Sequence, residues 1–210
     1  MSAAAALPSD RSDYPPIRDY ALIGDGRTAA LVDRGGSIDW LCLPDLDSPS
    51  VLAALLDRDR GGSFLLRPAQ AFEASRRYLP GSNILETTFT TATGEARVVD
   101  ALTLAGPGLE PGRELVRQVD GISGHVAFEF ALRPRFDYGR RNPRLRVRGG
   151  CGYAVDRSTA LALLAWPDAQ LAADDEAITG QLTVAAGERQ CPFARAGAAV
   201  EPVEDVQPRP

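Results

Sequence analysis

The sequence predicts an all-β protein, built as an antiparallel β-sandwich with one short helix. Short apolar segments with alternating polar residues recur along most of the chain, and Gly, Pro or Asn separates them. These strand-like segments do not alternate with crossover helices, which argues against a parallel doubly wound sheet. With 210 residues, of which 44% are hydrophobic, the chain can bury one substantial core, and we expect a single domain.

The first strands are predicted within residues 17–44. Three apolar segments, IRDYALIG, RTAALVD and SIDWLCLP, are separated by short glycine-containing breaks at 25–26 and 34–36. Glycine in such breaks supplies the positive φ that tight hairpin turns need. The segments therefore predict a three-stranded meander. Gly24-Asp25-Gly26 lacks the third glycine and the following helix of a dinucleotide-binding loop, so we interpret it as a hairpin turn.

The one predicted helix lies near residues 49–57, where the hydrophobic period changes. Asp47 or Ser48 can cap its first turn, and Pro49 suits the first helical position. The segment SVLAALLD then places its valine and leucine side chains on one side.

From Gly62 to about residue 199 the pattern returns to short strands, for example SFLLRP, NILETTFTTA, EARVVDALTL, HVAFEFALRPR and TALALLAW. We expect residues 1–14 to be a flexible leader and residues 15–199 to form the sandwich. Residues 200–210 are proline-rich and acidic, as a linker-like tail would be. Long, exposed sheet edges are expected, and they favour a covering partner.

Composition argues against several functional classes. The formal net charge of −5 and the pI near 5.0 argue against nucleic-acid binding. Cys42, Cys151 and Cys191 lack CxxC spacing and His125 is the only histidine, so we expect no disulfide framework, no metal site and no cofactor. Free thiols indicate a reduced, cytoplasmic setting. We expect neither a signal peptide nor a membrane span, because no segment has the required charge or apolar length.

The segment GSIDWLCLPDLDSPS, residues 36–50, is the first candidate site. In an extended segment Asp45 and Asp47 would face the same side, roughly 6–7 Å apart. That distance lies near the roughly 6.5–9.5 Å between the carboxylates of inverting glycosidases. Two aspartates beside a proline are more commonly a turn or a helix cap, and we favour that interpretation. Strand alternation favours a core or interface position for Trp40 over a role as a sugar platform, and of the two it favours the core.

The basic segment RPRFDYGRRNPRLRVR, residues 133–148, is the second candidate. Its interleaved aromatic residues would allow stacking on nucleic acid, but the acidic total and the use of arginine for every basic residue weigh against this. Arg144, Arg146 and Arg148 alternate with apolar residues. This pattern predicts a half-buried strand with a solvated or partner-facing row of guanidinium groups.

The order of four motifs points to a family. The motifs are DYALIGDGRTAALVDRGGSIDWLCLP, DSPSVLAALLD, YLPGSNILETTFTTATGEARVVDALTL and RPRFDYGR. Together they closely resemble the N-terminal β-sandwich domain of glycoside hydrolase family 15 proteins of the bacterial trehalase and glucoamylase-like type. The resemblance extends from about Tyr14 to about Ala199. It implies a large, supersandwich-like antiparallel fold, which in that family precedes an (α/α)6 barrel with two catalytic glutamates for inverting hydrolysis of α-glucosidic bonds.

No series of long helices follows in these 210 residues, so we expect the barrel to be absent from them. We therefore assign no catalytic residue and expect the chain alone to be inactive. The resemblance implies that the loop from Trp40 to Ser50 reaches toward the barrel and shapes the mouth of its active site. Asp45-Leu46 departs from the Arg-Phe usual at this place, and the reversed charge weakens the expectation of an inherited sugar contact. The residues expected at the substrate rim or the domain interface are Trp40, Asp45, Asp47, Ser48, Asp137, Tyr138 and Arg140.

The expected partners are the (α/α)6 domain, in cis or in trans, and an α-glucoside through it. Asp137 is expected to pair with Arg135 or Arg140. Two alternatives remain open: a sandwich that binds carbohydrate by itself through Trp40, Tyr138 or Trp166, and a homodimer formed through an edge strand or the arginine-bearing strand.

Overall fold

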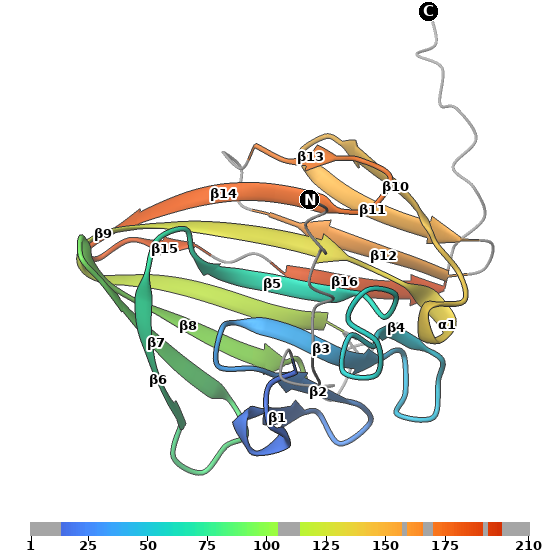
Figure 1. Cartoon of the computed structure of the whole chain (residues 1–210), viewed down its shortest axis with the longest axis horizontal. Coiled ribbons are helices and arrows are strands. Elements are labelled where there is room, and N and C mark those ends of the chain that lie inside the picture. Colours follow the sequence, from blue (N-terminus) through green and yellow to red (C-terminus); the bar gives the residue numbers. More distant parts are fainter. Residues whose placement is uncertain (1–13, 105–113, 157–158, 166–169, 191–192, 199–210) are drawn as a thin grey trace, which may run out of the picture.

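The computed structural model describes residues 14–104, 114–156, 159–165, 170–190 and 193–198, with side chains described as far as Gln190. Within these ranges the chain forms 16 strands, and their pairs are antiparallel (Figure 1). The predicted all-β class is confirmed. The strands belong to one curled sheet that folds into two facing layers, because the 20-residue strand β9 (Glu114–Arg133) runs through both.

The first layer has the order β1-β2-β3-β5-β9-β14-β13, and β4 pairs with β3. A short 3-10 turn at Ile17–Asp19 precedes it. The predicted N-terminal meander is present as β1, β2 and β3. The bounds are β1 (Ala21–Gly24), β2 (Ala29–Val32), β3 (Ser37–Cys42), β4 (Ser50–Leu52), β5 (Ser63–Pro68), β13 (Ala172–Ala173) and β14 (Ile178–Ala185).

The second layer has the order β6-β7-β8-β9-β16-β12-β11-β10, and β15 pairs with β9. The bounds are β6 (Phe72–Tyr78), β7 (Leu85–Thr91), β8 (Gly94–Leu102), β10 (Arg144–Arg148), β11 (Cys151–Asp156), β12 (Thr159–Leu164), β15 (Arg189–Gln190) and β16 (Phe193–Ala198).

The two layers enclose a single apolar core. Phe89 of β7 meets Phe128 of β9 across it, with ring centroids 6.0 Å apart and an edge-to-face angle of 81°. Strand β9 passes from one layer to the other at Gly124, which has φ 57° and would place a Cβ 2.1 Å from the carbonyl oxygen of Thr93. Only glycine fits this crossing.

The predicted helix near residues 49–57 is wrong. Ser50–Leu52 form β4, in which Leu52 pairs with Leu41 of β3, and turns follow. The backbone N–H groups of Ala53 and Ala54 donate across the chain to the carbonyl oxygens of Gly61 and Gly62, at 2.7 and 2.9 Å. The segment from Val51 to Ala54 is buried on all sides, whereas an amphipathic surface helix would bury only one.

The one α-helical element among the described residues is α1 (Phe136–Gly139), a single turn that the sequence does not predict. No helix in the part of the chain described is long and apolar enough to cross a bilayer. The expected tail and all of the expected leader except Tyr14 lie outside the described residues.

Candidate functional site

The turn α1 has an unusual backbone. Asp137, Tyr138 and Gly139 all have positive φ, at 52°, 57° and 79°. Left-handed conformations at non-glycine residues cost on the order of 1–3 kcal/mol each, and they occur preferentially where function constrains the backbone. Gly139 is required here, because a Cβ would lie 2.5 Å from the carbonyl oxygen of Arg60. The turn therefore holds Tyr138 in a conformation that local sequence preferences oppose.

Hydrogen bonds fasten α1 to β4. The backbone N–H of Tyr138 donates to the hydroxyl of Ser50 at 3.0 Å, and the backbone N–H of Arg135 donates to the carbonyl oxygen of Val51 at 3.1 Å. This contact brings the rings of Tyr138 and Trp40 to a centroid distance of 6.2 Å, with a tilt of 43°. Two of the predicted site residues therefore meet, although Trp40 belongs to the first of the four motifs and Tyr138 to the last.

Trp40 lies on the outer face of the meander, and its favoured core position is wrong. A bulge in β3 pairs Trp40 with Leu31 but Ile38 with Val32, so Asp39 is an extra residue between them. The side chains of Ile38 and Leu41 enter the core, whereas Trp40 is half-buried. The regular alternation that predicted a core tryptophan is interrupted at this point.

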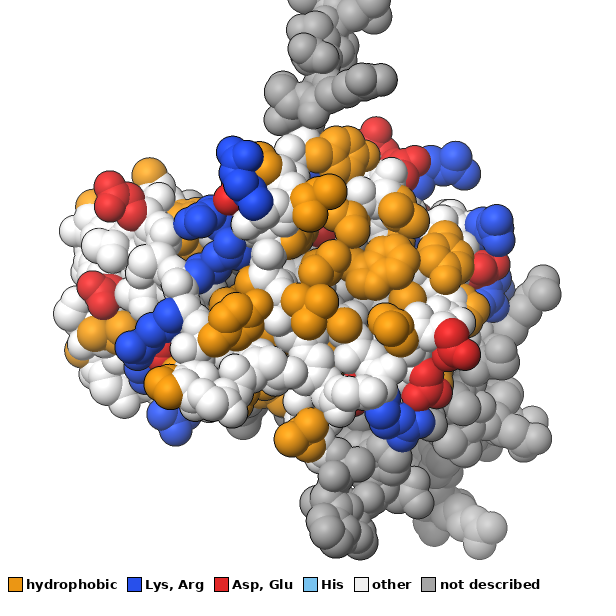
Figure 2. Space-filling view, turned by 90° about the horizontal axis from the view of Figure 1, so that it is seen from below, with side chains coloured by type: hydrophobic (Ala, Val, Ile, Leu, Met, Phe, Trp, Pro, Cys, Tyr) orange, Lys and Arg blue, Asp and Glu red, His pale blue; other side chains and the backbone are white. Residues whose placement is uncertain are grey.

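Apolar side chains cross the outer face of the meander in a row. Leu22 lies opposite Leu31, and Leu31 lies opposite Trp40, so the three share one face. Tyr138 adjoins Trp40, and the hydroxyl of Tyr78 bonds to the backbone of Leu22 at the other end. Figure 2 views the molecule from the side on which β1 and β2 lie in Figure 1, and hydrophobic side chains gather on that face. We call these five residues the meander row.

The loop between β3 and β4 is a turn closed by Asp45 and Ser48. The backbone N–H of Asp45 donates to the Ser48 hydroxyl at 3.1 Å, and the backbone N–H of Ser48 donates to the Asp45 carbonyl oxygen at 3.0 Å. Arg27 donates to the Asp45 carboxylate from Nε and Nη2, at 3.0 and 2.7 Å. Asp47 is exposed at the tip. These contacts agree with the favoured turn interpretation, and Asp45 is engaged in an ion pair.

The remaining predicted residues lie around α1. Asp137 pairs with Arg140 at 3.8 Å, which confirms the expected pairing with a neighbouring arginine. The Arg140 side chain is 76% exposed, so this pair contributes only about 0–1 kcal/mol. Asp137 and Arg140 therefore remain available to a partner surface.

A buried acidic network behind the meander row was not predicted. Asp39 is only 3% exposed, and it accepts hydrogen bonds from the hydroxyls of Tyr20 (2.7 Å) and Ser37. Burial, and then the bond to Asp39, raises the pKa of Tyr20. Burial also raises the pKa of Asp33, although the Ser37 N–H donates to it. The sequence gives no signal for this network, because the burial of Asp39 depends on the bulge in β3.

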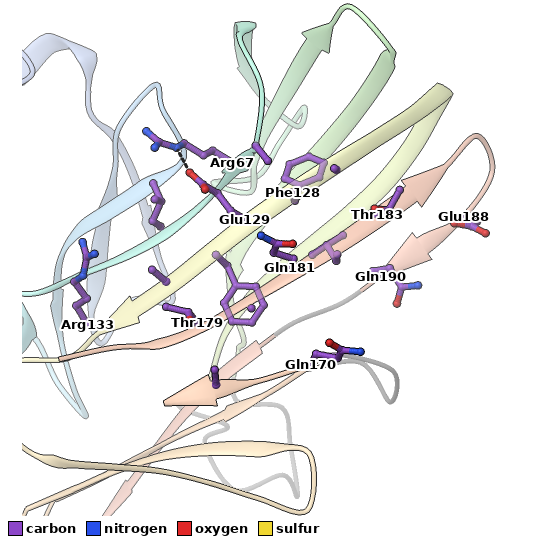
Figure 3. Close-up of a pocket in the computed structure, with 18 residues that line it drawn as sticks. Arg67, Phe128, Glu129, Arg133, Gln170, Thr179, Gln181, Thr183, Glu188 and Gln190 are labelled. Carbon is purple, nitrogen blue, oxygen red and sulfur yellow. Dashed lines mark hydrogen bonds and ion pairs between the residues drawn. The ribbon is translucent and has the colours of Figure 1, made fainter. Parts of the chain in front are cut away.

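A polar trough of about 990 Å³ lies over β5, β9 and β14 (Figure 3). Arg67 and Glu129 form an ion pair of 2.8 Å on its floor, and Gln181 lies beside them. The Phe128 ring in its lining is fully buried. The trough therefore offers hydrogen-bonding groups without the exposed aromatic ring on which a sugar usually stacks.

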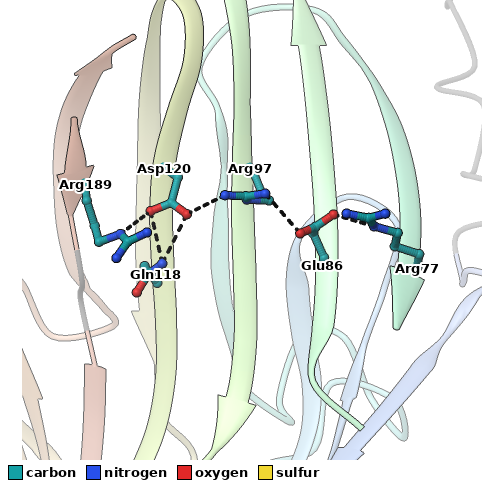
Figure 4. Close-up of polar contacts among 6 residues, drawn as sticks. All are labelled: Arg77, Glu86, Arg97, Gln118, Asp120 and Arg189. Atoms are coloured by element: carbon teal, nitrogen blue, oxygen red, sulfur yellow. Dashed lines mark hydrogen bonds and ion pairs between the residues drawn. The ribbon is translucent and has the colours of Figure 1, made fainter. Parts of the chain in front are cut away.

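The second layer carries a ladder of alternating charges on its outer face (Figure 4). Its ion pairs, from β6 to β15, have lengths of 2.6, 3.2, 3.0 and 2.7 Å. The members are Arg77, Glu86, Arg97, Asp120 and Arg189. Because each carboxylate lies between two guanidinium groups, the ladder stabilises the strand order.

Within the described ranges, no group of three or more His, Cys, Asp or Glu side chains is placed to hold a metal ion. Cys42 and Cys151 are free thiols, and burial raises the pKa of Cys42.

The described part of the chain is an all-β domain with an apolar row on one outer face, next to a strained turn, and exposed apolar rows of this kind are typical of interaction surfaces. Comparison with known proteins identifies the family. The chain belongs to the trehalase-like N-terminal domain family, whose profile matches residues 10–186.

Its relatives include proteins named trehalase. The chain is 42% identical over 173 residues to "Trehalase" of Mycolicibacterium smegmatis, a match covering 74% of this chain and 26% of the relative. It is 41% identical over 160 residues to "Trehalase" of Mycobacterium tuberculosis, covering 67% and 23%. It is 37% identical over 131 residues to "Trehalase 1" of Sulfolobus acidocaldarius, covering 62% and 21%. The chain thus spans about a quarter of the length of the relatives that it matches.

Proposed function

We propose that this domain is the non-catalytic accessory part of an α-glucoside hydrolase of the trehalase or glucoamylase type, within glycoside hydrolase family 15. The matches to proteins named trehalase support this proposal, as does the family to which the chain belongs. In this proposal an (α/α)6 barrel, in cis or in trans, performs the hydrolysis, and the 210 residues alone are inactive.

The meander row is the observation that carries the proposal. Leu22 and Tyr138 are 53% and 44% exposed, and large apolar side chains that lie side by side at such exposure favour a covering partner. Burying the remaining half of a large apolar side chain contributes about 1 kcal/mol. The row therefore supplies several kilocalories per mole of driving force for packing on the barrel.

The loop from Trp40 to Ser50 and the turn α1 lie next to the row, and in this proposal they shape the mouth of the barrel's active site. Asp47 and Arg140 are exposed there, and Asp45 and Ser48 hold the loop in its turn. The strained backbone of α1 favours this role, because it fixes the direction of the Tyr138 ring before any partner binds.

The test is reconstitution of activity. Glucose release from trehalose and from maltotriose is measured for this chain, for a separately expressed barrel of a related trehalase, and for their mixture. We expect release to require the mixture, and Leu22→Asp to weaken association because it places a charge in the row. Ile122→Asp is the matched control, since Ile122 is 44% exposed but lies on β9, outside the row. Hydrolysis by the chain alone, or equal effects of the two substitutions, would contradict the proposal.

A stand-alone carbohydrate-binding role is the second candidate, and the adjacent rings of Trp40 and Tyr138 favour it. Titration of the isolated domain with trehalose and maltotriose, followed by tryptophan fluorescence, separates the two. Saturable binding that Trp40→Ala removes would favour the binding module. The third aromatic candidate, Trp166, lies outside the described residues.

A cytoplasmic location and a homodimer complete the proposal. The free thiols of Cys42 and Cys151 support the first, and cell fractionation tests it. Sedimentation at several salt concentrations tests the second, since a contact in which arginines of one copy meet carboxylates of the other weakens as ionic strength rises.

A further inference from the structure

Strand β10 ends the second layer in the part of the chain described. It pairs with β11 on one side only, and an edge strand presents backbone N–H and C=O groups without strand partners. Leu145 anchors β10 to the core, whereas Val147 is 37% exposed. In Figure 1, β10 lies on the side of the molecule away from β1, so this edge is distinct from the meander row.

One face of this edge is strongly basic. Arg144, Arg146 and Arg148 are exposed and project from the same side of β10, about 7 Å apart from one to the next. They lie opposite Val155, Tyr153 and Cys151 of β11, of which Val155 and Tyr153 are exposed. The face therefore combines a row of three guanidinium groups with an adjoining apolar strip.

These guanidinium groups have no carboxylate within 4.0 Å among the described residues. Two acidic side chains of the surrounding elements are engaged elsewhere, and those of Asp175 and Glu176, in the turn between β13 and β14, are exposed but form no ion pair with these arginines within the described ranges. Asp156 of β11 accepts a hydrogen bond from Arg141 at 3.0 Å, and Asp174 in the turn before β14 accepts two backbone N–H groups at 2.8 Å. The lack of an ion pair distinguishes the three arginines of β10 from those of the charge ladder, each of which has an acidic neighbour.

Charge decides which occupant fits. In a two-fold dimer formed by pairing β10 with itself, arginines would face arginines across the interface, which is destabilising. Single-stranded nucleic acid would use aromatic stacking, and of the residues on this face only Tyr153 offers an exposed ring. An extended polypeptide complements both the unpaired backbone groups and, where acidic, the arginines.

We propose that the β10 edge binds an extended acidic segment of a polypeptide, which adds to the sheet as a further strand. Its alternate aspartate or glutamate side chains lie over Arg144, Arg146 and Arg148, and its intervening aliphatic side chains lie against Val147. The period of two along a strand matches the spacing of the arginines. This site does not depend on the proposed accessory role.

The probe is a fluorescein-labelled nonapeptide in which glutamate alternates with valine and threonine, and its binding to the 210-residue chain is followed by anisotropy. We expect saturable binding that weakens as salt rises. The variant Arg144→Glu/Arg146→Glu/Arg148→Glu is expected to lose about tenfold or more in affinity, because like charges then face each other. Arg18→Glu/Arg58→Glu/Arg60→Glu changes the net charge equally at exposed positions elsewhere and is expected to bind as the unchanged chain does.

Two further probes make the test specific. A peptide of the same charge with a central proline cannot complete the strand ladder and is expected to bind at least several-fold more weakly. Arg146→Glu alone is expected to give an intermediate loss if the triple variant unfolds, which circular dichroism detects. Absence of binding, equal binding of the proline peptide, equal loss in the control variant, or tighter binding of an oligothymidylate of similar charge would each overturn the proposal.

Discussion

Arg117 is predicted to hold the two layers together. Its side chain is fully buried, and its Nε and Nη2 donate to the Asp100 carboxylate at 2.8 and 3.3 Å. Its Nη1 and Nη2 also donate to the carbonyl oxygens of Phe64 and Gly36, both at 2.8 Å. Arg117 and Asp100 face each other in the second layer, whereas Phe64 belongs to the first. One guanidinium group thus satisfies a buried carboxylate and links the layers.

Arg117→Leu removes every one of these donors. The Asp100 carboxylate, which is 1% exposed, is left without its cation, and breaking a buried pair in this way costs about 3–5 kcal/mol. The contact between the guanidinium and the Phe64 ring, at 5.0 Å, is lost as well. Asp100→Leu in the same chain removes the stranded charge, so the double variant should recover about half or more of the loss.

The assay is urea unfolding followed by circular dichroism, with the free energy of unfolding compared in a double-mutant cycle. Arg67→Leu is the control, because the Arg67–Glu129 pair has the same 2.8 Å distance but side chains that are 45% and 39% exposed, and its loss should cost about 0–1 kcal/mol. A cost for Arg117→Leu no larger than that of the control, or strictly additive effects in the double variant, would refute the reasoning.

Three further predictions concern the ladder and the turn α1. Burial alone would raise the pKa of Asp120, but hydrogen bonds from Arg189, Arg97 and Gln118 hold it below its usual value. A lowered pKa stabilises the fold above the unfolded value of about 3.9, and this stabilisation is lost as pH falls through the folded value. Asp120→Asn should therefore lower the urea midpoint at pH 7, and the difference from the unchanged chain should shrink as pH falls below about 4. A difference in midpoint that does not shrink as pH falls below about 4 would contradict this. Gly149→Ala should destabilise the fold by about 1–2 kcal/mol, because alanine disfavours a positive φ. Gly139→Ala should cost more in thermal melts, because residue 139 has a positive φ and also lacks room for a Cβ. Equal losses of stability in the two variants would contradict this, because they would mean that the Arg60 backbone shifts to accommodate the Cβ. Ser50→Ala should cost about 1 kcal/mol and change the emission of Trp40, since the Tyr138 N–H loses its acceptor; unchanged emission would mean that this bond does not position the ring.

Local sequence patterns were sufficient for the strands of the meander. Gly26 and Gly36 have φ of 85° and 83°, as the predicted hairpin turns require, and β1, β2 and β3 follow in the expected order. These features depend on a few neighbouring residues, so composition and alternation reveal them. The same holds for the all-β class and for the exposed arginines of β10.

The segment after Pro49 shows where local patterns fail. Its leucines and alanines fit one side of a helix, but the structure buries Val51 to Ala54 on every side, and Ala53 bonds to Gly61. Periodicity cannot report whether the second side of a short apolar segment is also covered. That depends on chain segments that approach from elsewhere in the fold.

The candidate site could be named from motifs, but its geometry depends on tertiary structure. Ser50 and Tyr138 are 88 residues apart in the chain, and their hydrogen bond places the Tyr138 ring beside Trp40. The bulge in β3 turns Trp40 outward and buries Asp39. The alternation of apolar and polar residues in this segment does not predict the bulge. By itself the sequence determined the all-β class, the meander strands with their hairpin turns, and the motifs, because these follow from short-range preferences. The tertiary structure alone decided which side chains meet and which are buried, because the folded layers bring distant segments to within hydrogen-bonding distance.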